Sequence, residues 1–433
     1  MISCQKLISR LAERAYDDRL DFLYCCAGQR KDLDEVRARC IRTATAYQEQ
    51  FPDSAERPAA LFSGPGRTEI GGNHTDHQHG RVLAASVNLD MLGAAAPNGT
   101  MVANVVSEGY PPLHVDLTDL DPQLAEQGGS SALIRGVAAG LARLGHPVGG
   151  FDAYITSSVP AGSGLSSSAA YEVLIGNVMN AFFCDGQVNA VELAKIGQYA
   201  ENVYFGKPCG LMDQMASSVG NVVAIDFLDP GQPAVNQVKY DFAASGHDLC
   251  IIDSGADHAD LTDEYAAITV EMGEVAGYFG KKVLREVNEK DFRAALPALR
   301  GAVGDRAVLR AMHFFEDDRR AAQEAEALER GDFDGFLKLV NASGLSSSLY
   351  LQNTWAASQP RQQAVVLALK LAEEYLDGKG AVRVHGGGFA GTIQVFVPTN
   401  MTQGLIAHME QVLGKGKCHV LSIRPEGGCL VAG

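Results

Sequence analysis

Residues 159–170 read Val-Pro-Ala-Gly-Ser-Gly-Leu-Ser-Ser-Ser-Ala-Ala and separate a strand-like apolar segment, 151–155, from a helix-like one, 169–183. Glycine lets the backbone approach a ligand closely, and the free N–H groups at the start of a helix attract anions. The consecutive hydroxyls at 166–168 can hold phosphate oxygens or a metal-bound water. The stretch therefore predicts a loop that holds a nucleotide phosphate, with a plain glycine–serine turn as the alternative. It is not a Walker A loop, because Gly-Lys-Ser/Thr occurs nowhere in the chain.

The composition is that of a globular protein with an acidic balance. The chain of 433 residues is 46% hydrophobic and 20% charged, with a net charge of -16. This charge argues against nucleic acid or an anionic membrane as a partner, since both attract basic surfaces. No run of residues is long and apolar enough to span a bilayer. Nine cysteines without a C-x-x-C pair, and a charged N-terminal segment without an apolar core, predict a cytoplasmic protein with reduced thiols.

Hydrophobic periodicity predicts a mixture of helices and strands without strict alternation, so we expect the α+β class. Residues 32–35 resemble a helix-capping box. A domain boundary is expected near 244–246. The expected helices fall within 1–50, 132–144, 169–183, 188–204, 261–280, 306–330, 361–375 and 401–413, and the expected strands within 61–106, 151–155, 221–227, 249–253, 382–385, 392–397 and 418–423.

A second segment, residues 63–80, concentrates hydrogen-bonding side chains between glycines: Arg67, Glu69, Asn73, His74, Asp76, His77 and His79. Such groups are costly to bury without a ligand that satisfies them. Carboxylate, amide and imidazole groups suit the hydroxyls of a sugar. A solvated polar loop is one alternative. A zinc site is another, although in an extended segment His74 would point away from His77 and His79.

Two further segments carry candidate chemistry. Asp213 stands in a glycine-bounded apolar context that suits a catalytic carboxylate beside an attacking hydroxyl. Glu201, at a predicted helix end, suits Mg²⁺, which prefers oxygen ligands. The alternatives are a helix N-cap for Asp213 and a solvent-facing charge for Glu201. Residues 385–391 match G-x-G-x-x-G, but strands are expected on both sides, which excludes the dinucleotide-binding fingerprint.

Together and in this order, these segments resemble the GHMP kinase family, and within it most closely the galactokinases. Gly66-Arg67 with residues 72–76 resembles the galactokinase signature, and residues 160–168 resemble the family's phosphate motif. Further resemblance lies at 208–214, 258–265 and 386–391, and the whole covers the chain from about residue 61 onward.

The resemblance implies a two-domain fold with the active site between the domains. A helical N-terminal extension, 1–60, would precede a ribosomal-S5-like N-terminal domain, 61–245, and a ferredoxin-like C-terminal domain, 246–433. It also implies that ATP and Mg²⁺ serve to phosphorylate the anomeric hydroxyl of D-galactose. The partners would be the small-molecule sugar and ATP, and the protein a monomer or a weak homo-oligomer.

The resemblance further implies a role for each matching residue. Asp213 would accept or orient the proton of the sugar O1, and Arg67 would stabilise the transferring phosphoryl group. The sugar would contact Glu69, Asn73, His74, Asp76, Gly210 and Tyr265. The phosphates of ATP would lie against Gly162, Ser163, Gly164, Leu165, Ser166, Ser167 and Ser168. Magnesium would bind Ser168 and Glu201, with Ser167 as an alternative hydroxyl.

The chain departs from the galactokinase pattern at several places. Galactokinases carry a glutamate where this chain has Asn73 and usually a tyrosine where it has His77. The basic run after Tyr265 and a Cys-Pro-Glu-Leu-Asp stretch near 356–361 are also replaced. Because an amide lacks charge, these changes keep open a kinase for a related sugar, such as N-acetylgalactosamine or arabinose. A non-catalytic galactose-sensing relative and, more distantly, a zinc hydrolase built on His74, His77 and His79 also stay open.

Overall fold

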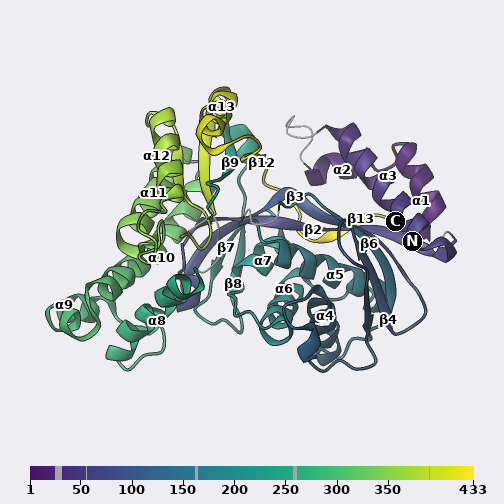
Figure 1. The fold of residues 1–433 in the computed structure, drawn as a ribbon, viewed down its shortest axis with the longest axis horizontal. Coiled ribbons are helices and arrows are strands. Elements are labelled where there is room, and N and C mark those ends of the chain that lie inside the picture. The colour runs from purple at the N-terminus through teal and green to yellow at the C-terminus, as the bar shows by residue number, and fades with distance from the viewer. Residues whose placement is uncertain (25–31, 55, 161–163, 257–260, 390) are drawn as a thin grey trace.

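Two long antiparallel strands, β2 (Pro58–Gly71) and β3 (Arg81–Pro97), run across the molecule (Figure 1). They belong to a computed structural model of the chain, which describes residues 1–24, 32–54, 56–160, 164–256, 261–389 and 391–433. The pairing shifts register between Pro65 and Arg67 and again between Glu69 and Gly71. Such irregularities re-aim side chains, and here they lie in the half of β2 that carries the predicted site residues.

The sheet built on β2 and β3 is mixed. β6 (Phe151–Ser157) pairs with β3 and runs parallel to β4 (Val102–Ser107). A crossover through a helix joins β4 to β6, as parallel strands require. The remaining described strands of this sheet are β1 (Ile2–Ser3), β5 (Leu113–Asp116), β7 (Val222–Asp226), β8 (Ala234–Val238) and β13 (Cys429–Ala432).

Helices that lie before and after the phosphate-loop stretch in the sequence cover one face of this sheet (Figure 1). They are α4 (Ser130–Arg143), α5 (Ser167–Phe183), α6 (Ala190–Tyr199) and α7 (Met212–Val219). α5 is apolar over most of its surface, which predicts a buried helix. Gly64 allows it to approach β2, because a Cβ there would lie 2.1 Å from the carbonyl oxygen of Ala170.

The predicted helices before residue 50 are confirmed and cover the opposite face (Figure 1). They are α1 (Cys4–Ala12), α2 (Asp17–Tyr24) and α3 (Leu33–Gln50). Asp32 caps α3, as expected, and accepts a hydrogen bond from the backbone N–H of Asp34 at 2.8 Å. The last strand, β13, pairs with β2 and packs in this core, so the end of the chain returns to the first sheet. The division at residue 245 stays a prediction.

A second, antiparallel sheet has the ferredoxin-like order β10-β11-β9-β12. Its strands are β9 (His247–Asp253), β10 (Ala381–Val384), β11 (Thr392–Pro398) and β12 (Cys418–Leu421). α12 (Ala364–Leu376) and α13 (Thr402–Leu413) pack on it through a common core. Between β9 and β10 lie α8 (Thr262–Tyr278), α9 (Glu289–Val303), α10 (Asp305–Glu329) and α11 (Phe333–Ser346). The predicted α+β class is confirmed.

Several elements differ from the predictions. The helix expected over 188–204 ends at Tyr199 and continues as a π-helical segment, η5 (Ala200–Phe205), a form that often occurs at functional sites. α9 and α11 were not predicted, since α9 contains Pro297 and α11 carries Gly335 and Gly344, which weaken the helical signal. In the described part of the chain, no helix has the length and apolar character that a membrane crossing needs.

Candidate active site

A cavity of about 460 Å³ opens where the site segments meet. Its walls come from the end of β2, the turn after it, the start of α7, α8 and the glycine loop between β10 and β11. The residues predicted from the sequence that line it are Arg67, Glu69, His74, Asp76, Gly210, Asp213 and Tyr265. Segments more than 300 residues apart thus share one cavity. The strands on either side of the glycine loop confirm that it is not a dinucleotide-binding turn.

Arg67 and Asp213 form a bidentate ion pair at this cavity. Nε of Arg67 lies 2.6 Å from Oδ1 of Asp213, and Nη2 lies 2.5 Å from Oδ2. Burial acts to raise the pKa of Asp213, but the guanidinium outweighs it and holds that pKa below its ordinary value. Asp213 is therefore an ionised carboxylate at neutral pH. Because Leu211 is the N-cap of α7, the N-cap alternative for Asp213 does not hold.

Arg67 also holds the described end of the phosphate loop. Its Nη1 donates to the carbonyl oxygen of Gly164, and its backbone N–H donates to that of Leu165 at 3.0 Å. Ser166, the N-cap of α5, has a φ of 56°, in the left-handed region that few non-glycine residues adopt. Ser167 and Ser168 then begin α5, whose first N–H groups favour anions. Gly162 and Ser163 lie outside the described residues.

The predicted magnesium residues lie in contact. The hydroxyl of Ser168 donates to Oε1 of Glu201 at 3.1 Å, and Glu201 is buried in η5. The amide of Gln214 donates to Oε2 of Glu201 at 2.8 Å and to Oε2 of Glu172 at 3.0 Å. Glu201 is thus not a solvent-facing charge. A hydroxyl beside a carboxylate fits Mg²⁺, which takes few protein oxygens and leaves the others to phosphates and water.

The turn after β2 is compact rather than extended. His74 has a φ of 60°, and residues Asp76–Gln78 form a 3-10 turn. The rings of His74 and His77 lie 5.9 Å apart, so the expectation that they point apart is wrong. The ring of Tyr265 lies 4.9 Å from that of His74. Even so, the described residues contain no group of three or more His, Cys, Asp or Glu arranged to hold a metal, which leaves the zinc alternative without support.

His74 is held as a neutral ring. Burial, and next the nearby His77, lower the pKa of His74 to about 3. Its Nε2 lies 3.0 Å from the carbonyl oxygen of Gly387, which can only accept, so the proton sits on Nε2. Nδ1 of His74, a residue that lines the cavity, is consequently an acceptor. Tyr265, on α8, lies 3.3 Å from Nε2 of His77 through its hydroxyl.

Glu69, not Asn73, brings a side chain to the cavity. Oε1 of Glu69 accepts from Nδ2 of Asn73 at 2.8 Å and from Nη2 of Arg383 at 2.6 Å. Burial outweighs the charge of Arg383 and raises the pKa of Glu69 to about 7. Asn73 is 0% exposed, and it does not line this cavity among the described residues. The structure therefore places Asn73 against Glu69 but outside the lining of the cavity.

Asn73 connects its own turn to three other parts of the chain. Its Nδ2 also donates to the carbonyl oxygen of Gly386 at 2.8 Å, and its Oδ1 accepts from Asn353 at 2.8 Å. Its backbone N–H donates to Asp317 at 2.8 Å, and its carbonyl oxygen lies 3.0 Å from Nε2 of His313. His313 and Asp317, both on α10, were not predicted as site residues from the sequence. Their spacing at i and i+4 in a helix is a weak signal, since it is equally typical of a solvated face.

The comparisons with known proteins agree with this geometry. Residues 45–97 match the galactokinase galactose-binding signature, and residues 132–221 match the GHMP kinases N terminal domain. A galactokinase of Streptomyces coelicolor is 30% identical over 344 residues, which span 78% of this chain and 85% of that protein.

This chain belongs to the galactokinase family. Its resemblance to the GHMP kinases, predicted from the motifs, is thereby confirmed. The structure of a Lactococcus lactis galactokinase complexed with galactose has a TM-score of 0.74 at 24% identity, with 89% of this chain and 98% of that chain covered. A Methanococcus jannaschii mevalonate kinase has a TM-score of 0.60 at 14% identity, with 84% and 98% covered. The GHMP kinase fold of this galactokinase-family chain is confirmed.

Proposed function

We propose that this protein transfers the γ-phosphoryl group of ATP to the anomeric hydroxyl of D-galactose, giving galactose 1-phosphate and ADP. The observation that carries the proposal is the Arg67–Asp213 pair, which connects the cavity lined by the proposed sugar-binding residues to the described end of the phosphate loop. The family assignment, the galactose-binding signature and the fold support it.

The chemistry asks mainly for positioning and charge stabilisation. The carboxylate of Asp213 accepts the O1 proton of the sugar, or orients that hydroxyl, while O1 attacks the γ-phosphorus and the bond to the β–γ bridging oxygen breaks. Arg67 keeps Asp213 ionised and offers positive charge to the transferring group. The side chain of Arg67 also contacts Gly164 and its backbone N–H contacts Leu165, so one residue connects Asp213 to the described end of the phosphate loop.

Asp76, His74, Glu69 and Tyr265 are proposed to bind the sugar hydroxyls, with Gly210 as part of the wall. A Cβ at position 210 would lie 2.1 Å from Oδ2 of Asp76, so a larger residue there would displace this carboxylate from its present position. Nδ1 of His74 accepts from a hydroxyl, and charge-assisted bonds to Asp76 add strength. Asn73 supports Glu69 and the glycine loop rather than touching the sugar.

The nucleotide side is proposed to use the backbone of 162–168 and the start of α5 for the phosphates. Ser168 and Glu201 would hold Mg²⁺, which when bound neutralises phosphate charge. Lys207 lines the cavity and lies 3.5 Å from Oε1 of Glu201, where its positive charge faces the same region. We further propose that the protein works in the cytoplasm as a monomer or a weak homo-oligomer; its described cysteines are free thiols, as suits a reducing compartment.

A coupled assay for ADP release tests the proposal. Purified protein is supplied with ATP, Mg²⁺ and, in separate reactions, galactose, N-acetylgalactosamine, arabinose or no sugar. Galactose-dependent ADP release that is absent from Asp213→Asn supports it. A clear preference for another sugar would show that this sugar, rather than galactose, is the acceptor. A kinase for a related sugar is the second candidate, favoured by His77, which stands where galactokinases usually carry tyrosine. Galactose binding by calorimetry without ADP release would indicate a sensing relative instead.

A further inference from the structure

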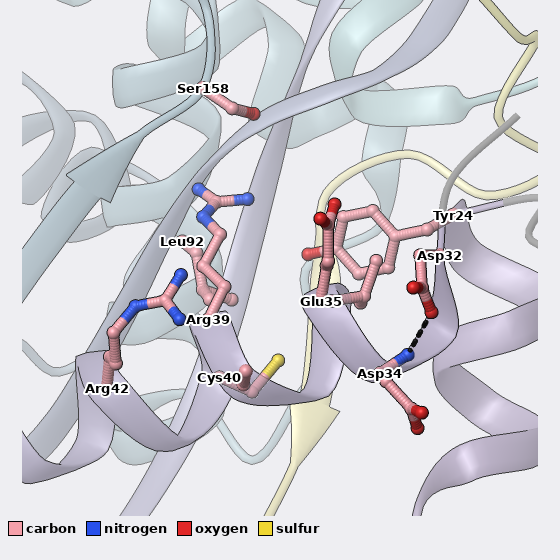
Figure 2. Close-up of a pocket in the computed structure, with 11 residues that line it drawn as sticks. Tyr24, Asp32, Asp34, Glu35, Arg39, Cys40, Arg42, Leu92 and Ser158 are labelled. Atoms are coloured by element: carbon pink, nitrogen blue, oxygen red, sulfur yellow. Dashed lines mark hydrogen bonds between the residues drawn. The ribbon is translucent and has the colours of Figure 1, made fainter.

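The N-terminal helical layer reaches the strands that lead into the phosphate loop. Arg39, on α3, lies beside β3, with its Nη1 2.5 Å from Oδ1 of Asp90. Its Nη2 lies 3.2 Å from the carbonyl oxygen of Asp90 and 3.2 Å from that of Thr156 on β6. Figure 2 shows the guanidinium of Arg39 directed toward Ser158. A residue of the first fifty thus contacts both strands that flank Ser158.

Asp90 also forms hydrogen bonds with Ser158, at the start of the phosphate loop. Its backbone N–H donates to the hydroxyl of Ser158 at 2.9 Å, and its carbonyl oxygen accepts from the N–H of Ser158 at 2.9 Å. The residues that follow Ser158 lead directly to Gly162. The two described ends of the loop are therefore each tied to an arginine–aspartate pair, Arg39–Asp90 before it and Arg67–Asp213 after it.

The Arg39–Asp90 pair is built to stay charged. Asp90 is 0% exposed, and its Oδ2 accepts from the hydroxyl of Tyr24 at 2.6 Å, while Ser63 and Arg424 lie close to the same carboxylate. Burial acts to lower the pKa of Arg39, but the charge of Asp90 outweighs it and raises that pKa. A buried carboxylate that loses such a partner destabilises its surroundings strongly.

A cavity beside the pair leaves one side of Ser158 without packing, so the hydrogen bonds there matter more for its position. A cavity of about 660 Å³, shown in Figure 2, is lined by Arg39, Arg42, Leu92 and Ser158. Protein interiors are otherwise close-packed and hold their segments by contact. Where Ser158 borders this cavity, the hydrogen bonds of Arg39 and Asp90 act together with the packing of Val159 in the core.

We propose that Arg39 is a positioning residue for ATP: the N-terminal helical layer fixes the start of the phosphate loop through Arg39, Asp90 and Ser158. The proposal rests on the assignment of residues 162–168 to the phosphates of ATP. In this proposal the N-terminal helices contribute to nucleotide binding, although Arg39 does not line the cavity proposed for the sugar.

The test measures nucleotide affinity directly, so that it does not depend on which sugar is phosphorylated. Calorimetry with Mg·ADP is carried out on the full chain and on Arg39→Met and Arg39→Lys. Arg39→Met should weaken Mg·ADP binding by roughly ten- to a hundredfold, the size that a small displacement of a binding element can cause. Arg39→Lys should restore part of the affinity. With a sugar that the wild-type protein phosphorylates, KM for ATP should rise in Arg39→Met while KM for the sugar stays unchanged.

Two controls separate positioning from general stability. Leu11→Ala removes an apolar side chain from the core of the same helical layer and lowers the melting temperature without touching a hydrogen bond. Arg42→Met removes an exposed charge from the lining of the same cavity. Both should keep the wild-type affinity for Mg·ADP. Equal weakening in Leu11→Ala and Arg39→Met would overturn the proposal.

A milder variant keeps the idea testable if Arg39→Met does not fold. Ser158→Ala removes only the hydroxyl that accepts from the N–H of Asp90. It should weaken Mg·ADP binding measurably, with the sugar KM unchanged. A folded Ser158→Ala protein with wild-type affinity for Mg·ADP would contradict the role of this contact. Loss of kinase activity toward every sugar, with the nucleotide effects intact, would instead count against the proposed function alone.

Discussion

Nδ2 of Asn73 donates a hydrogen bond to Oε1 of Glu69 across 2.8 Å, so the amide supports the carboxylate from behind. The two residues stand four positions apart, yet only Glu69 lines the cavity. A carboxyl group that ionises near neutral pH is therefore present in the cavity wall, although the chain lacks the glutamate that galactokinases carry at position 73. The proposed galactose specificity does not need that glutamate.

Asn73→Glu should destabilise the protein rather than reorder its sugar preference. The substitution removes two donated hydrogen bonds and sets a second carboxylate beside Glu69. Each buried group left unsatisfied costs about 1–3 kcal/mol, so we expect a loss of at least about 2 kcal/mol in the free energy of unfolding. Urea unfolding measures it, with Asn73→Gln as the control that keeps the amide. A stable variant with a new preference order across the sugar panel would show that position 73 reads the sugar.

Glu69 should make sugar binding depend on pH near neutrality. The pKa of this carboxyl is about 7, so the ionised acceptor forms as the pH rises from 6 to 8. KM for the sugar should therefore fall over that range, and Glu69→Gln should flatten the profile and raise KM about tenfold, since bonds to charged groups contribute about 1.5–3 kcal/mol. His77→Asn is the control for the neighbouring imidazole. A pH-dependent KM that survives in Glu69→Gln would assign the effect to another group.

The same raised pKa affects stability with a definite sign. The folded state holds the Glu69 proton up to about pH 7, whereas the ordinary value is 4.5. This contribution is thus fully present below pH 4.5 and is lost as the pH rises through 7. Urea unfolding between these limits should show a decline with pH in the wild type that is reduced in Glu69→Gln. A decline of the same size in both proteins would contradict the assignment.

Elements that depend on the local sequence pattern could be predicted from the sequence. The strand before residues 159–170 and the helix that begins within them are found as β6 and α5, because apolar periodicity acts over short distances. The extended conformation predicted for residues 73–79 was wrong. His74 and His79 adopt positive φ values that the sequence pattern does not predict. That turn brings His74 and His77 together and shapes the sugar wall.

The role of Asn73 could not be predicted because its partners lie far along the chain. Asp317, Asn353 and Gly386 are separated from it by 244, 280 and 313 positions. Nothing in the local pattern distinguishes a buried amide that joins three segments from one that contacts a ligand. The family resemblance supplied the place of the motif, and only the fold supplied the direction of each side chain.

Asp213→Asn should abolish phosphorylation while nucleotide binding is retained. The amide keeps the size of the side chain but cannot accept the O1 proton as a carboxylate does, and general-base contributions are typically 10²–10⁴-fold. We expect kcat to fall by about that factor with the affinity for Mg·ADP within roughly twofold of wild type, by single-turnover kinetics and calorimetry. Asp226→Asn, at the end of β7 and away from the cavity, is the control. Near wild-type turnover in Asp213→Asn would remove the carboxylate from the mechanism.

Glu201→Gln should raise the Mg²⁺ concentration that half-maximal activity requires. The substitution removes the negative charge beside Ser168 while keeping a side chain of the same length. A rise of at least about tenfold is expected, since even partners outside the first shell of a metal contribute 10–100-fold to affinity. A Mg²⁺ titration of ADP binding measures it independently of turnover, with removal of the metal by EDTA as the reference. Glu192→Gln, at a half-buried position on α6 that pairs with Lys195, should leave the titration unchanged.

Arg67→Met should shift the acidic limb of the kcat–pH profile toward higher pH. In the wild type the guanidinium holds the pKa of Asp213 below its ordinary value against burial. Without that charge burial dominates, the pKa of Asp213 rises, and the active carboxylate is lost at a higher pH. Arg67→Lys keeps a charge but not the bidentate geometry, so it should keep most of the limb's position while lowering kcat. An unmoved limb in Arg67→Met, with kcat reduced, would mean that Arg67 acts on the phosphoryl group alone and does not set the ionisation of Asp213.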